Sequence, residues 1–176
     1  VGMVAQLRGS KGHLDFLEAI SELSKENARF YIVGDGEGRK LYENKAAEWN
    51  LLNKRVFFLG YREDIPTVMA GLDLLVIAST RTEGIPQVAL QSMSMGVPIV
   101  GTNIGGVPEV LFPSKSGLVV PPKNSMALAN GIRILLKNKK IRERMGNMGQ
   151  EFVDRNFSLE NMIKKILFLY EEVIAD

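Results

Sequence analysis

The 176-residue chain has no cysteine, and its one histidine is His13. Without cysteine, a disulfide framework and a thiolate metal site are both excluded. A single histidine with no cysteine or second histidine beside it does not suggest a zinc site, and no recognisable motif supplies a Ser-His-Asp triad around it. We therefore interpret His13 as a structural residue at the start of a helix. The absence of thiols suits a reducing compartment, and we expect a cytoplasmic protein.

The chain also lacks a strong charge of either sign. Its formal net charge is +2, from 22 basic and 20 acidic residues spread along the sequence. Such a balance argues against nucleic acid as a partner. A local basic run is interpreted as a solvated helix face; it comprises Lys137, Lys139, Lys140, Arg142 and Arg144.

No signal peptide and no membrane-spanning run are visible in these residues. Contact of a full-length protein with the inner face of a membrane stays open, without support from this sequence. The length and the 45% hydrophobic content fit one globular domain that buries roughly 70% of the surface of its unfolded chain. The chain begins at Val1, already inside an apolar run, which suggests a segment cut from a longer protein.

What the sequence does contain is an alternation of apolar runs and helical patterns. The runs LLVIA and FYIV are apolar on both faces, which indicates a parallel sheet covered by helices on both sides. We predict a doubly wound α/β fold of about six strands with a helical C-terminal tail. The expected strands are 1–7, 30–33, 56–59, 72–78, 98–101 and 118–120. The expected helices are 14–25, 39–49, 65–70, 87–95, a turn near Pro108, 125–136, 141–155 and 159–174.

A doubly wound sheet binds ligands outside the carboxyl ends of its strands, at the switch point between the first and fourth strands. Residues 6–12 and 79–86 follow those two strands here. The first loop offers Arg8 and Lys11 among glycines, so that two cations and an approachable backbone can meet a phosphate. Either loop alone is typical of an ordinary solvated surface, but together they predict an anion site.

The second loop leads into a helix, whose free N–H groups and dipole favour anions. The segment Glu83, Gly84, Ile85 and Pro86 lies at that helix start. Gln91 follows eight residues after Glu83, so the acid and the amide could hold two hydroxyl-bearing groups of one elongated ligand. The alternative is that Gln91 is a satisfied polar residue between helix and sheet.

Two glycine runs are open to both structural and functional interpretations. Residues 34–38 read GDGEG; they lack the spacing of a dinucleotide-binding motif and are interpreted as a tight turn that lines the edge of the crevice. Residues 105–109 read GGVPE, and they either bring Glu109 to the crevice or cap a short helix.

Taken in order, these segments resemble the C-terminal, donor-binding domain of a GT-B glycosyltransferase of retaining family four. The resemblance spans VGMVAQLRGSKGH, FYIVGDGEGRKL, RVFFLGYREDIP, DLLVIASTRTEGIPQVALQSMSMGVPIVGTNIGGVPEV, SGLVVPP and the helical tail. It implies that residues 1–176 form one Rossmann-like half of a GT-B fold. The N-terminal half, which holds the acceptor in this family, would then be absent from the chain.

The resemblance also implies roles for individual residues. The family carries two acids separated by seven residues; the first touches the donor sugar and matches Glu83, and the second touches the ribose and falls on Gln91. In the first loop Lys11 matches a diphosphate-gripping lysine, while the expected arginine falls on Gln6, with Arg8 nearby. The base is expected near Phe58, Leu59, Gly60 and Tyr61, for which core packing of Phe58 and Leu59 is the alternative.

The implied reaction is transfer of a sugar from a nucleotide diphosphate donor to an acceptor, with retention of configuration. Lys11 and the helix start near Gly84 would stabilise charge on the leaving diphosphate, and Glu83 would orient the donor sugar. No metal and no cofactor are implied. The isolated domain is expected to bind donor weakly and to transfer nothing. A non-catalytic nucleotide-sugar-binding module and another GT-B enzyme, such as a sugar-nucleotide epimerase, are the alternatives.

Overall fold

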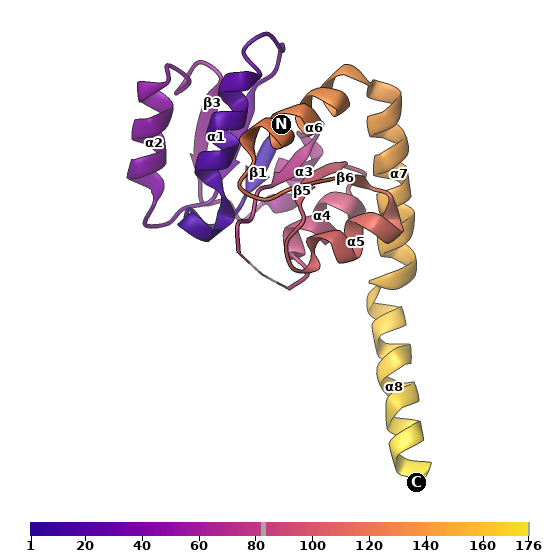
Figure 1. The fold of residues 1–176 in the computed structure, drawn as a ribbon. Helices are drawn as coiled ribbons and strands as arrows, with labels where there is room; N and C mark the ends of the chain where they lie inside the picture. Colours follow the sequence, from indigo (N-terminus) through magenta and orange to yellow (C-terminus); the bar gives the residue numbers. More distant parts are fainter. Residues whose placement is uncertain (82–83, 176) are drawn as a thin grey trace.

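The computed structural model describes residues 1–81 and 84–175. These residues form strands and helices that alternate along most of the chain (Figure 1). The strands are β1 (Gly2–Val4), β2 (Phe30–Val33), β3 (Val56–Gly60), β4 (Leu75–Ile77), β5 (Ile99–Thr102) and β6 (Gly117–Val120). The helices are α1 (His13–Glu22), α2 (Arg39–Glu48), α3 (Ile65–Ala70), α4 (Gln87–Ser94), α5 (Gly106–Ser114), α6 (Ser125–Lys137), α7 (Lys139–Asn156) and α8 (Leu159–Ala175), with a 3₁₀ turn η1 (Gly9–Lys11).

The strands form one parallel sheet in the order β3-β2-β1-β4-β5-β6. This is the doubly wound arrangement, and the prediction of its fold class is confirmed. The order reverses between β1 and β4, which are hydrogen-bonded neighbours. Because all strands are parallel, their carboxyl ends lie along one edge of the sheet, and the loops after β1 and β4 meet there.

Helices cover both faces of the sheet, which explains why the strands carry no polar alternation. In β4, Val76 belongs to one buried core cluster, with side chains from α1, α2 and α6. Its neighbours Leu75 and Ile77 belong to a second cluster, with side chains from α3, α4 and α5. Burial of each such side chain contributes roughly 1.5–3 kcal/mol, so both faces of the strand favour the sheet.

Helix α5 is longer than predicted. A single turn was expected near Pro108, whereas α5 has nine residues. Val107, Val110 and Leu111 are buried at helical spacing, and this apolar stripe extends the helix beyond one turn. Pro108 lies in the first turn, where its missing N–H breaks no hydrogen bond within the helix.

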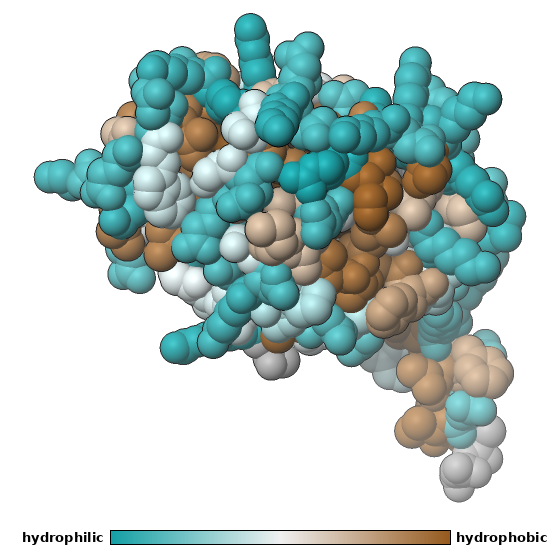
Figure 2. All heavy atoms as spheres, turned by 45° about the horizontal axis from the view of Figure 1, so that its top comes forward, coloured by the Kyte–Doolittle hydropathy of each residue, from teal (hydrophilic) through white to brown (hydrophobic). Residues whose placement is uncertain are grey.

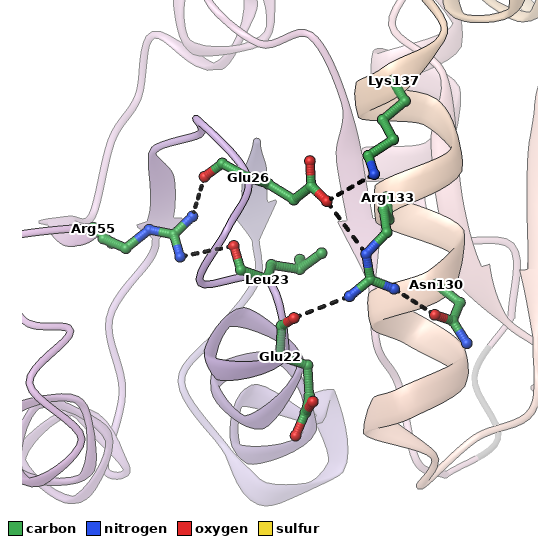
Figure 3. A network of polar contacts seen from close by, with 7 residues as sticks. All are labelled: Glu22, Leu23, Glu26, Arg55, Asn130, Arg133 and Lys137. Atoms are coloured by element: carbon green, nitrogen blue, oxygen red, sulfur yellow. Dashed lines mark hydrogen bonds and ion pairs between the residues drawn. The ribbon is translucent and has the colours of Figure 1, made fainter.

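A network of polar contacts joins three elements at the amino edge of the sheet (Figure 3). Arg55, which precedes β3, donates hydrogen bonds from Nη1 to the carbonyl of Leu23 at 2.8 Å and from Nη2 to that of Glu26 at 2.7 Å. Arg133 of α6 donates from Nη2 to the carbonyl of Glu22 at 2.9 Å. These two guanidinium groups satisfy carbonyls at and just beyond the C-terminus of α1, where cations are favoured.

The carboxylate of Glu26 completes this network. It lies 3.3 Å from Nε of Arg133 and 3.4 Å from Nζ of Lys137, both of which belong to α6. The Glu26 side chain is largely buried, whereas that of Lys137 is 65% exposed. The ion pair with Arg133 therefore lies in a less solvated setting than the pair with Lys137. The network ties α1 to α6 on the side of the sheet opposite the carboxyl edge.

Helix α8 extends away from the body of the molecule beyond the end of α7 (Figure 1). Its apolar side chains are exposed, and Figure 2 shows them as brown atoms on the projecting helix. They include Leu159, Met162, Ile163, Ile166, Leu167, Leu169, Tyr170, Val173 and Ile174. Within the described residues, no helix has the length and apolarity needed to cross a membrane.

Candidate functional site

The loops after β1 and β4 are tied together at the carboxyl edge of the sheet. The backbone N–H of Thr80 donates to the carbonyl of Ser10 at 2.9 Å, and the Thr80 hydroxyl lies 3.4 Å from the carbonyls of Gly9 and Ser10. Gly12 has a φ of 74°, and a Cβ there would collide with the carbonyl of Ala78. Glycine at this position therefore permits the close approach of the two loops. The predicted meeting of the loops at the switch point is observed.

A small hollow of about 130 Å³ lies between these loops. Lys11 and Gln6 line it from the first loop, Ser79 from the end of β4, and Pro86 and Val88 from the start of α4. Its floor is apolar and formed by strand residues. A lysine above an apolar floor beside a helix start is suited to an anion, because the cation and the free N–H groups of the helix both favour negative charge.

A larger hollow of about 500 Å³ lies on the other side of β1. Its rim includes Gly34 and Asp35, which follow β2, and Tyr61 and Arg62, which follow β3. Gln6 lines this hollow as well as the smaller one. Val4 and Ala5 line both hollows too, so the two lie next to each other at the carboxyl end of β1.

The glycine run at residues 34–38 forms the tight turn that was predicted at the crevice edge. A Cβ at Gly34, whose φ is 133°, would collide with the carbonyl of Ala5. The Asp35 carboxylate accepts hydrogen bonds from the N–H of Gly36 at 2.8 Å and from Nη1 of Arg39 at 3.1 Å. These bonds, chiefly that from Gly36, lower the pKa of Asp35. The rim of the larger hollow thus carries a carboxylate in its charged form.

The residues expected to hold a base occupy different environments. Tyr61 lines the larger hollow and is 72% exposed. Gly60 precedes it, and its carbonyl accepts a hydrogen bond from the N–H of Gly34 at 2.8 Å. Phe58 packs against the core, and Leu59 is exposed. Of these residues, Tyr61 is the one whose side chain is positioned to contact a ligand in the hollow.

The segment before α4 is described from Gly84 onward, and Glu83 lies outside the described residues. Gly84 and Ile85 are exposed, while Pro86 has extended backbone and precedes the helix. The N–H of Ala89 donates to the carbonyl of Pro86 at 2.9 Å, which closes the first turn of α4. The start of α4 thereby borders the smaller hollow.

The remaining predicted residues are Arg8 and Gln91. Arg8 is exposed and immediately precedes η1, which contains Lys11. Gln91 is exposed on α4, one turn after Gln87, which is also exposed. Neither Arg8 nor Gln91 is among the residues that line the two hollows. Exposure of Gln91 does not fit its alternative interpretation as a polar residue enclosed between helix and sheet.

His13, the first residue of α1, is fully buried and stacks on Tyr42 with ring centroids 4.8 Å apart. Burial lowers its pKa to about 4. Glu109, for which two roles were left open, is exposed in the first turn of α5. A carboxylate there is favoured by the helix dipole. His13 thus has a structural role, whereas the two roles of Glu109 stay predictions.

Sequence reasoning missed Thr80, the residue that ties the first loop to the end of β4. Its position directly after the apolar run of β4 was visible, but a threonine in a polar loop has no distinctive spacing. Asp35 was considered only as part of a glycine run, and its place on the rim of the larger hollow depends on the turn geometry. Among the described residues, no group of three or more His, Asp or Glu side chains gathers to hold a metal ion.

Comparison with known proteins gives one consistent result. The model of the family described as glycosyl transferases group 1 matches residues 1–152. N-acetyl-alpha-D-glucosaminyl L-malate synthase of Bacillus anthracis is 28% identical over 178 residues, and alpha-D-kanosaminyltransferase of Streptomyces kanamyceticus is 30% identical over 174 residues. These matches cover 98% and 97% of this chain but 45% of each relative. The chain therefore spans about half the length of the curated relatives it matches.

Solved structures agree with the sequence matches. HepE of Anabaena in complex with UDP superimposes with a TM-score of 0.89 at 26% identity, which covers 97% of this chain and 48% of that chain. The C-terminal domain of LpcC, a glycosyl transferase group 1 family protein of Francisella tularensis, superimposes with a TM-score of 0.80 at 25% identity. That match covers 90% of this chain and 86% of the LpcC domain.

Proposed function

Because the chain belongs to the glycosyl transferases group 1 family, we propose that it is the C-terminal, donor-binding half of a retaining glycosyltransferase. The observation that carries this proposal is the pair of neighbouring hollows that share residues 4–6 at the carboxyl edge of the sheet. An elongated ligand with an anionic centre fits such an arrangement. A nucleotide diphosphate sugar is a ligand of this kind.

We place the donor along the crevice, so that it extends from the larger hollow into the smaller one. The base lies in the larger hollow beside Tyr61, and the diphosphate lies in the smaller hollow between Lys11 and the start of α4 at Gly84, Ile85 and Pro86. The sugar is held by Glu83. HepE was solved with UDP, so UDP is the first nucleotide to test.

With the donor placed in this way, the domain stabilises the charge on the leaving diphosphate and orients the donor sugar. The bond between the sugar and the diphosphate breaks, and negative charge develops on the leaving diphosphate. Lys11 stabilises this charge together with the backbone N–H groups at the start of α4. The acceptor is bound by a part of the protein outside this chain, so the full-length protein is needed for transfer.

A second candidate function is a nucleotide-sugar-binding module without transfer activity. The specific observation in its favour is the neutral side chain at two positions, Gln6 and Gln91, where the family carries charged residues. An amide at position 91 can still accept and donate hydrogen bonds to ribose hydroxyls, but it does so without charge assistance. Weaker donor binding is expected in either case.

Titration of the chain with UDP, GDP and ADP tests the donor site. We expect at least one of them to shift the NMR signals of residues 8–12 and 84–91 at millimolar concentration. If no nucleotide does so, the assignment of the crevice is wrong. Transfer by the full-length protein, with the configuration of the product read by NMR, then separates the enzyme from the binding module.

A further inference from the structure

The start of α5 lies directly against the segment that precedes α4. Gly106, the first residue of α5, is buried. A Cβ built on it would lie 2.5 Å from the backbone nitrogen of Ile85 and 2.7 Å from the carbonyl carbon of Gly84. Both are backbone atoms, so the contact cannot be relieved by a change of side-chain rotamer. A residue larger than glycine at position 106 requires either the helix or the segment to move.

Helix α5 is held more firmly than the segment at residues 84–85. Its side chains Val107 and Leu111 rest on Gly101 of β5, where a Cβ would lie 2.6 Å and 2.9 Å from their methyl carbons. Val107, Val110 and Leu111 are fully buried. Displacement of α5 would open this tightly packed core and destabilise the fold.

The turn into α5 is fixed as well. Gly105 has a φ of 52° and a ψ of −135°, a conformation that residues with a side chain rarely adopt. The N–H of Ile104 donates to the carbonyl of Thr102 at 2.8 Å, and the N–H of Val107 donates to the carbonyl of Ile104 at 3.2 Å. These contacts hold the beginning of α5 to the end of β5. Residues 84 and 85 are exposed. A side chain at position 106 would therefore displace this segment and leave α5 in place.

We infer that Gly106 is a positioning residue for the donor site: it allows α5 to support the backbone of Gly84 and Ile85 from behind. This inference rests on the proposed function, in which the backbone beside α4 meets the diphosphate. A displacement of about 1 Å in such a group is enough to lower its contribution strongly. Gly106 thus acts on the ligand through the segment it supports, without touching the ligand.

The test compares Gly106→Ala with the matched variant Gly117→Ala. A Cβ at Gly117 would also collide with backbone, that of Ile99, but at the amino edge of the sheet. We expect both variants to lose thermal stability. Only Gly106→Ala should shift the amide signals of residues 84–88 in the ligand-free protein and weaken binding of the nucleoside diphosphate at least tenfold.

The outcomes separate this inference from the proposed function. If the parent chain binds UDP, GDP or ADP and Gly106→Ala binds it equally well with unshifted amide signals, the role of Gly106 is overturned. If the parent binds none of the three, the proposed function is contradicted instead. Should Gly106→Ala fail to fold, the parent still provides a test, because a nuclear Overhauser effect between Gly106 Hα and the Ile85 amide is expected. Its absence would contradict the contact.

Discussion

At the scale of single residues, Lys11 is the side chain on which the proposed diphosphate site depends most. It lines the smaller hollow beside the start of α4. We expect Lys11→Ala to weaken UDP binding by about 1.5–3 kcal/mol, the contribution of a charge-assisted hydrogen bond. Uridine has no phosphate, so its binding should change little. Calorimetry with both ligands measures the difference, and equal losses would show that Lys11 acts through folding or through the base.

Arg8 provides the matched comparison for Lys11. It carries the same charge and is exposed two residues from the position where the family places an arginine, but it lines neither hollow. We expect Arg8→Ala to weaken UDP binding less than Lys11→Ala does. A larger effect of Arg8→Ala would mean that Arg8 reaches the phosphates and compensates for the neutral side chain of Gln6.

Substitutions of Gln91 test whether this residue contacts the ribose of the donor. In the full-length protein, Gln91→Glu should bind donor as tightly as the parent or more tightly, because a carboxylate is the stronger acceptor. Gln91→Leu should leave a hydroxyl unpaired and weaken binding by roughly 1–3 kcal/mol. The reverse order in a donor titration, or no effect of either variant, would refute the role.

His13 is expected to make stability depend on pH. Its pKa is about 4 in the folded protein, against about 6.5 in an unfolded chain. As pH falls below 6.5, the unfolded state gains a proton that the folded state does not bind, so stability decreases down to about pH 4, by about 3 kcal/mol in total. Urea unfolding between pH 7 and 5 measures this slope. His13→Phe, which keeps an aromatic ring against Tyr42, should flatten it, and an identical slope in the variant would count against the buried neutral histidine.

At the scale of elements, the network at the end of α1 is expected to support the fold without affecting the crevice. Arg133→Ala removes the hydrogen bond to the Glu22 carbonyl and the ion pair with Glu26. The expected loss is about 1–2 kcal/mol of unfolding free energy. Lys137→Ala removes one well-exposed ion pair to the same carboxylate and should cost less than about 0.5 kcal/mol. Urea unfolding ranks the two variants, and neither should change UDP affinity.

The elements that could be predicted from the sequence are those whose signal is local. Runs such as LLVIA are apolar at every position, because central strands such as β4 are buried on both faces, and this pattern predicted the six strands and their parallel arrangement. The length of α5 could not be predicted in the same way. It depends on Gly101, which leaves space for Val107 and Leu111 to pack, and that contact exists only once β5 and α5 are brought together.

The candidate site also has some features that the sequence predicts and others that it does not. The topology of a doubly wound sheet places the loops that contain Lys11 and Pro86 at one switch point, so their meeting could be predicted. The bond between Thr80 and Ser10, and the contact between Gly106 and Ile85, depend on backbone conformation in the turns. No pattern of residue types in the sequence predicts such contacts. The sequence therefore predicts where the crevice lies, but it does not predict which residues hold the surrounding loops in place.

At the scale of the whole molecule, α8 is a separate part attached to the body by its N-terminal end. It packs extensively against no other element of the described chain, and its apolar side chains are exposed. Exposed apolar faces of this size are typical of surfaces that contact another molecule or another part of a protein.

Removal of residues 159–176 should therefore leave the body intact. We expect the melting temperature of the shortened chain to stay within about 2–4 °C of the parent, the equivalent of about 1 kcal/mol. Any self-association through the apolar face of α8 should decrease, because that face is lost. Calorimetry and sedimentation velocity measure the two effects. A large fall in melting temperature would mean that α8 packs against the body in solution.

The amino edge of the sheet, where Arg133 joins α6 to the end of α1, has a practical consequence for experiments on the crevice. It lies at the opposite end of the strands from both hollows, and Lys25 is exposed there. Since the chain has no cysteine, Lys25→Cys would provide a single thiol for coupling to a sensor surface. A chain immobilised through this thiol would present its crevice to the flowing solution in one uniform orientation.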